Sequence, residues 1–152
     1  MAPHSLEARL VDCADLSQVA AIIPCYTALV SRLLHDPSGH ALTACAEAMA
    51  AMLTSGREEM RVWRACEGDA TVGLLIAERQ VVSGVPRIWV HLCGLYPGYM
   101  ASEVMEDLDA AVVQWGQTVG AQMIEFETTR APQVWQARGY MPVRTVMRKV
   151  VA

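Results

Sequence analysis

The sequence predicts an α+β (mixed α/β) fold in which a mostly antiparallel sheet is flanked by helices. Three observations support this fold class. Up to about residue 56, apolar side chains recur mainly at helical spacing. After residue 56, three stretches rich in Val, Ile, Leu and Trp are separated by short turns. A further helical pattern then precedes another strand. A chain of 152 residues can bury one sizeable core, so residues 1–152 are expected to form a single domain.

Each element follows from a local pattern. The first long helix repeats apolar side chains every three to four residues, and Pro24 is expected to kink or split it. The last long helix carries a similar stripe and is expected to stop at Gly120. Short turns at 67–69 and 83–86 predict an antiparallel meander. The predicted elements are a strand at 6–11, helices at 16–34 and 41–53, strands at 60–66, 71–82 and 87–95, a helix at 102–119, a strand at 122–128, a short helix at 131–137 and a final strand or strand pair within 141–151.

Composition and charge exclude several classes of protein. Hydrophobic residues make up 53% of the chain and charged residues 18%, which is too apolar for a disordered protein, yet no apolar run is long enough to cross a bilayer. A net charge of −4 argues against a nucleic-acid partner bound through a broad basic surface. The N-terminus lacks the basic and apolar regions of a signal peptide, so we expect a cytoplasmic protein with no membrane partner.

The cysteines and histidines show no pattern of a metal site. No two of the five cysteines form a CxxC pair, and the four histidines lack HExxH spacing. We therefore expect no metal and reduced thiols that are buried as small apolar groups.

The order of elements and the C-terminal third of the chain resemble the GNAT superfamily of N-acetyltransferases. Residues 133–143, QVWQARGYMPV, look like the family segment in which a short helix ends in Gly-Phe/Tyr before x-Pro-Val, and Leu95-Tyr96-Pro97 resembles the Val-x-Pro after the fourth strand. The resemblance implies a GNAT-like sheet. It also implies that Gly139 ends the short helix in a left-handed conformation and that the ring of Tyr140 enters the core.

Two departures from the family pattern concern its usual chemistry. GNAT enzymes bind the pyrophosphate of acetyl-CoA with Arg/Gln-x-x-Gly-x-Gly/Ala at the start of the central helix, where residues 100–105 here read MASEVM. These residues provide no glycine, and Glu103 adds a carboxylate. Many members also carry a tyrosine acid four residues before the Gly of Gly-Phe/Tyr. That position is Trp135, which cannot act as an acid near neutral pH and could simply pack the helix on the sheet.

Three residues are candidates for a site if the resemblance holds. His91 lies in the fourth predicted strand, near where family members keep a base, and an imidazole can accept a proton from an amine. Arg130 follows the fifth predicted strand and could hold a phosphate or a carboxylate, while Leu95 would contribute backbone to the pantetheine arm of acetyl-CoA. The alternatives are a structural, hydrogen-bonded His91 and a surface Arg130. Arg144 and Arg148 indicate a solvated or partner-facing edge.

The sequence leaves two hypotheses of function open. The first is a GNAT-fold protein without ordinary acetyltransferase activity and without a cofactor, which works as a binding or structural module with a protein partner or as a homo-oligomer. The ending at 141–149 loosely resembles small GNAT-like proteins encoded by bacteriophages, which implies a virion protein. The alternative is an acetyl-CoA-dependent N-acetyltransferase with an atypical cofactor pocket and His91 as its base.

Overall fold

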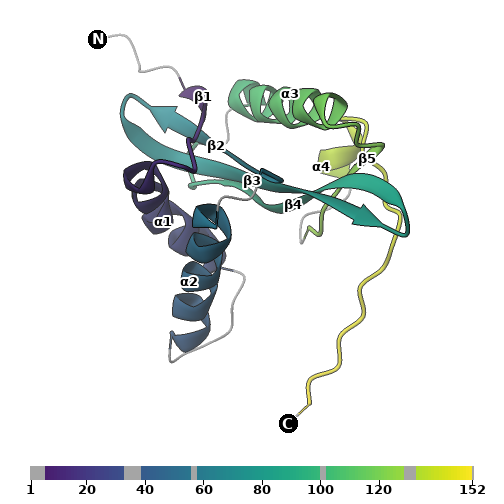
Figure 1. Ribbon diagram of the computed structural model, residues 1–152, viewed down its shortest axis with the longest axis horizontal. Helices are drawn as coiled ribbons and strands as arrows, with labels where there is room; N and C mark the ends of the chain where they lie inside the picture. Colours follow the sequence, from purple (N-terminus) through teal and green to yellow (C-terminus); the bar gives the residue numbers. More distant parts are fainter. Residues whose placement is uncertain (1–5, 33–38, 56–57, 100–101, 129–132, 152) are drawn as a thin grey trace.

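The computed structural model describes a five-stranded sheet with helices on both faces (Figure 1). The strand order is β1-β2-β3-β4-β5, in which neighbours are antiparallel except for the parallel pair of β4 and β5. The described residues are 6–32, 39–55, 58–99, 102–128 and 133–151. The elements are β1 (Leu6–Leu10), α1 (Leu16–Val30), α2 (His40–Thr54), β2 (Met60–Glu67), β3 (Ala70–Val82), β4 (Val85–Leu95), α3 (Ser102–Thr118), β5 (Met123–Glu125) and α4 (Gln133–Gln136).

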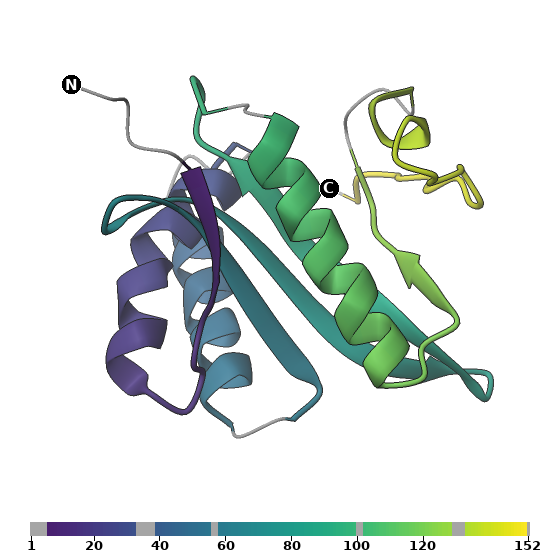
Figure 2. The ribbon, with the colours of Figure 1, turned by 90° about the horizontal axis from the view of Figure 1, so that it is seen from above.

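The core lies in two layers, one on each face of the sheet. Helices α1 and α2 pack on one face through a cluster that includes Ile22, Leu53 and Ile76. Helix α3 runs across the opposite face (Figure 2), where Leu108 and Ile88 are fully buried. Each such side chain contributes about 1.5–3 kcal/mol by leaving water, so both layers hold the sheet. The predicted mixed α/β class with a mostly antiparallel sheet is confirmed.

Helix α3 buries the apolar stripe that its sequence predicts. Leu108 and Val112 at its centre are at most 1% exposed and pack against β3 and β4. The helix stops before Gly120, which has a φ of +74°. The amide of Ala121 then donates to the carbonyl of Gly116 at 2.8 Å and the amide of Gly120 to the carbonyl of Gln117 at 3.3 Å, the two bonds that close a glycine-capped helix end. The prediction that Gly120 ends this helix is confirmed.

A two-residue turn sets the register of the longest hairpin. Ser83 and Gly84 both have positive φ, +52° and +79°, which matches the twist of the strands they join. Val82 therefore pairs with Val85, and β4 starts inside the stretch that the sequence assigns to the turn. This register fixes which side chains of β3 and β4 meet on each face of the sheet.

Three predicted elements differ from the structure. Helix α1 continues through Pro24 without a break, and β5 ends at Glu125 rather than at residue 128. The predicted final strand is wrong. Residues 141–151 form neither helix nor strand, their side chains are exposed, and the segment leaves the sheet on the side of α1 and α2 (Figure 1). A strand needs a neighbour for its backbone groups, and none lies alongside this segment in the described part of the chain. Separately, no helix among the described residues is long and apolar enough to span a bilayer.

Candidate functional site

Strands β4 and β5 separate partway along their length. Their parallel pairing ends where Trp89 lies opposite Glu125. Beyond that point β4 continues to Leu95 along β3, whereas the chain leaves the sheet at Phe126. Residues 90–95 thus have no strand neighbour on this edge among the residues that the structure describes. Such an edge can accept an extended ligand that carries amide groups, because its backbone N–H and C=O groups point outward.

A β-bulge lies at the same place. Ile76 pairs with Leu92 and Ala77 with Val90, so His91 is the extra residue on β4. Val90 belongs to the core cluster under α3, whereas Leu92 belongs to the cluster under α1 and α2. The bulge therefore places His91 and Leu92 in succession on the α1 and α2 face. Bulges commonly redirect a side chain in this way next to a functional site.

His91 is held by a carboxylate from the neighbouring strand. Its Nε2 lies 3.1 Å from Oε1 of Glu78, and the two side chains are 23% and 12% exposed. A carboxylate can only accept, so Nε2 carries the hydrogen and donates it. The lone pair of the neutral ring then resides on Nδ1, which is the nitrogen that can take up a proton.

Glu78 belongs to a polar cluster that runs across the face of the sheet. Its Oε1 also accepts from Nε2 of Gln80 at 2.8 Å. Oε1 of Gln80 accepts from Nε and Nη2 of Arg87 at 3.1 and 2.8 Å, and Nη1 of Arg87 pairs with Glu125 at 3.2 Å. Arg144 from the C-terminal segment also binds Glu125. Because the central members are largely shielded from water, each one fixes the orientation of the next.

On the opposite face, three aromatic rings, those of Phe126, Trp135 and Tyr140, form a wall beside the point where the two strands separate. Tyr140 packs edge-on against Phe126 with ring centroids 5.1 Å apart, and Gly139 before it has a φ of +90°. The ring is half-buried rather than part of the core clusters that the sequence led us to expect. The hydroxyl of Tyr140 donates to Oδ1 of Asp109 at 2.5 Å. The wall borders a narrow cavity of about 20 Å³, lined by Leu75, Val90, Cys93, Met105, Asp109, Val112, Phe126, Trp135, Arg138 and Tyr140.

Neither aromatic hydrogen-bond donor in this wall is suited to act as an acid. Burial, together with the hydrogen bond to Asp109, raises the pKa of Tyr140 well above the usual range of a phenol. The indole Nε1 of Trp135 donates to Oγ1 of Thr128 at 3.1 Å, and its ring packs against Phe126. Trp135 thus has a packing role in this wall.

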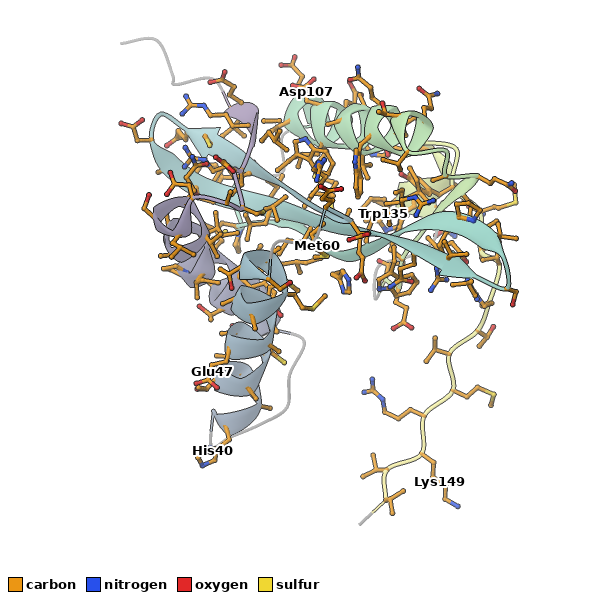
Figure 3. All side chains as sticks on the ribbon, viewed as in Figure 1. His40, Glu47, Met60, Asp107, Trp135 and Lys149 are labelled. Atoms are coloured by element: carbon orange, nitrogen blue, oxygen red, sulfur yellow. The ribbon has the colours of Figure 1, made fainter. Side chains whose placement is uncertain are left out.

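The remaining residues that the sequence singles out have different positions. Arg130 and residues 100–101 lie outside the described residues. The side chain of Leu95 is only 3% exposed, so this residue can offer a ligand only its backbone. Glu103 is exposed at the start of α3, and Asp107 lies on the outer side of this helix (Figure 3). Their carboxylates are therefore solvated rather than turned toward β4.

Sequence reasoning finds His91 but misses the residues that hold it. Glu78, Gln80 and Arg87 face the same side of the hairpin that Ser83 and Gly84 close. A two-residue turn of this type is recognisable in a sequence. Counting back from it pairs Glu78 with Trp89, two residues before His91 on β4 and so on the same face by strand alternation, a signal that could have identified the carboxylate.

Comparison with known proteins identifies the fold. No protein-family model and no curated protein matches the sequence. Among solved structures, a putative acetyl transferase from Pyrococcus furiosus aligns with a TM-score of 0.76 and 17% identity, over 95% of this chain and 100% of that chain. A predicted acetyltransferase from Clostridium acetobutylicum, solved with acetyl-CoA, aligns with a TM-score of 0.71 and 11% identity over 96% of each chain. AAC(6′)-Iy in complex with a bisubstrate analogue built on CoA aligns with a TM-score of 0.66 and 17% identity, over 97% of this chain and 99% of that chain. The chain therefore has the fold of GNAT acetyltransferases.

These neighbours correct two predictions. We expected a module without acetyltransferase activity and without a cofactor. Both predictions are wrong on this comparison, because the neighbours are acetyltransferases and several were solved with CoA or acetyl-CoA. The structure also removes part of the physical argument for those predictions. The carboxylate of Glu103 is exposed to solvent at the start of α3, and the open edge of β4 does not depend on that helix turn.

Proposed function

We propose that the chain is an acetyl-CoA-dependent N-acetyltransferase that transfers an acetyl group to an amine. The observation that supports this proposal most directly is the separation of β4 from β5, with His91 at the bulge beside the open edge. A shared fold alone does not establish a reaction, so the proposal depends on this geometry.

The described residues suit the extended part of acetyl-CoA. Its pantetheine arm carries amide groups, and β4 continues past the end of its pairing with β5 at Trp89, so no described strand accompanies this edge and a ligand could form hydrogen bonds of the kind that join strands. Helix α3 follows β4 and presents the amides of its first turn, which favour a phosphate group. When bound, acetyl-CoA supplies the thioester.

His91 would act as the base in this reaction. With Nε2 held by Glu78, Nδ1 takes the proton of the attacking amine. The amine nitrogen forms a bond to the thioester carbon, and the carbon–sulfur bond breaks. A thiol has an ordinary pKa of about 8.5, so the sulfur can leave as a thiolate near neutral pH without a strong acid. The reaction therefore does not require a proton from Trp135 or Tyr140.

The proposal is tested by calorimetry with acetyl-CoA and by thiol release with a panel of amines. We expect acetyl-CoA to bind with a Kd below about 1 mM, the upper end of common substrate constants. His91→Ala should lower kcat by about 10²–10⁴-fold and leave the Kd of acetyl-CoA unchanged, because a base contributes to the transition state. His40→Ala is the matched control, since His40 lies at the outer end of α2, away from the sheet (Figure 3).

Glu78→Gln separates a positioned base from a merely structural histidine. A glutamine can still accept a hydrogen bond from Nε2, but its amide can also turn its N–H₂ group toward the ring, so it holds the imidazole less firmly. A positioned base therefore predicts a lower kcat with an unchanged Kd of acetyl-CoA, whereas a merely structural histidine predicts an unchanged kcat. No binding at millimolar acetyl-CoA would refute the proposed function. Binding with full activity of His91→Ala would refute only the role of His91. A bacteriophage source stays a prediction, because neither the fold nor its neighbours bear on it.

A further inference from the structure

Residues 141–151, called here the C-terminal arm, expose an unusual amount of apolar surface. Figure 1 shows the arm leaving the sheet, and Figure 3 shows Lys149 well clear of every helix and strand. Patches of this kind on a folded protein usually mark a contact with another molecule. The exposed side chains are Met141 (73%), Val143 (66%), Val146 (65%), Met147 (91%), Val150 (82%) and Val151 (90%).

The arm has the composition of a strand without a neighbour. Four of its eleven residues are valine and one is threonine, it contains no glycine, and its proline stands second, near the start. The sequence accordingly predicts a strand here, yet the described chain gives the arm no strand to pair with. What the arm lacks is a partner edge rather than the tendency to form a strand.

Strand β5 offers an edge of the required kind. It is the last strand of the sheet and pairs only with β4 among the described residues. Met123, at its start, is 43% exposed. A groove of about 340 Å³ runs between α3, β5 and the turn after α4. An uncovered edge with apolar surroundings readily accepts a further strand.

The charge and the position of the arm make it suited to be this further strand. The arm carries Arg144, Arg148 and Lys149 but no acidic residue, so all sixteen Asp and Glu of the chain lie outside it. Arg144 binds Glu125 of its own β5, which holds the base of the arm at this edge, while residues 145–151 extend away from it. Seven extended residues span about 23 Å, enough to reach a neighbouring molecule.

We propose that the arm pairs as a strand with the β5 edge of a second copy of this chain, and that the second copy does the same in return. Because each arm starts at its own β5, the two β5 edges would face each other across a twofold axis. Each sheet would gain a sixth strand, and the exposed apolar side chains of both arms would be covered. This inference does not depend on the proposed function.

Sedimentation equilibrium and hydrogen exchange test the proposal on the full chain. Wild type should be a dimer at tens of micromolar. Replacing two neighbouring residues, Val146→Pro with Met147→Pro, removes a donor from each edge of the arm and should weaken dimerisation more than tenfold. The control, Val146→Ile with Met147→Leu, keeps both donors and the apolar character and should remain a dimer. Backbone amides of the arm should be protected above the dissociation concentration and lose this protection below it.

Each other outcome contradicts the proposal. Protection that does not depend on concentration would show that the arm pairs with its own chain. A monomeric wild type with no protected amides in the arm would show that nothing covers it. A proline variant that dimerises as well as wild type would place the contact between copies elsewhere on the surface.

Discussion

Two glycines on neighbouring strands give a sharp test of how tightly β3 and β4 pack next to the open edge. Gly73 of β3 pairs with Leu95 of β4. A Cβ at Gly73 would lie 2.2 Å from Cδ2 of Leu95 and 2.7 Å from the carbonyl oxygen of Gly94. The leucine methyl could rotate away, but the carbonyl oxygen belongs to the sheet backbone. A side chain at residue 73 therefore requires the strands to shift.

The expected cost follows from this geometry. Overpacking a core position costs about 1–3 kcal/mol, and replacing a strand glycine returns about 0.5–1 kcal/mol of backbone entropy. Gly73→Ala should therefore lower the free energy of unfolding by about 1–2 kcal/mol. For a chain of this length, that corresponds to a decrease in Tm of about 2–8 °C.

Gly94→Ala is the matched control, measured by the same thermal unfolding. A Cβ there would meet only the Leu29 methyl groups at 3.5 and 3.8 Å, which is ordinary contact. We expect its Tm to stay within about 2 °C of wild type or to rise, because backbone entropy is regained without a clash. Equal Tm values for the two variants would refute the reasoning, since they differ only in what the new methyl group meets.

Three further predictions concern the core, the alkaline limit of stability and the aromatic wall. Leu108→Ala should cost about 2–5 kcal/mol in chemical denaturation because Leu108 is fully buried, whereas Val113→Ala on the outer side of α3, at 38% exposure, should cost less than about 1 kcal/mol. Burial, and then a hydrogen bond with Cys25, raises the pKa of Tyr96 to about 12. The contribution of its neutral phenol to the free energy of unfolding is therefore complete below pH 10 and is lost as pH rises toward 12. Thermal melts from pH 8 to 11.5 should show this loss, and Tyr96→Phe should reduce it; an equally steep loss in that variant would contradict the assignment. Trp135→Phe removes the hydrogen bond to Thr128 and should lower stability by about 0.5–1.5 kcal/mol with kcat unchanged, whereas a large decrease in kcat would mean that the indole takes part in the reaction.

Much of the fold can be predicted because its signals are local. The stripe of α3 and the turns of the meander are patterns within a few residues, and the structure confirms them. Strand β5 is shorter than predicted because its length depends on where β4 stops accompanying it, which is a property of two segments far apart in sequence. The final strand at 141–151 fails for a similar reason, since strand propensity cannot provide a neighbouring edge.

The candidate site could be predicted only in part. His91 stands out as a histidine within an apolar strand, but the sequence does not reveal that it is the extra residue of a bulge, because that depends on pairing with β3. The carboxylates that organise the cluster come from β3 and β5, and only the sheet register brings Glu78 and Glu125 to the same face. The charge at the start of α3 is misleading in the sequence, because spacing does not show that Glu103 faces water.

The bulge also bears on how freely this position could change during evolution. If residue 91 were deleted, Leu92 would follow Val90 directly, and ordinary alternation would still direct these two side chains to the faces they occupy now. Strand β4 could thus have ten residues instead of eleven, with every apolar side chain still on its present face of the sheet. The apolar packing therefore gives no reason to retain residue 91, and selection on this position would act through the polar cluster to which the imidazole belongs.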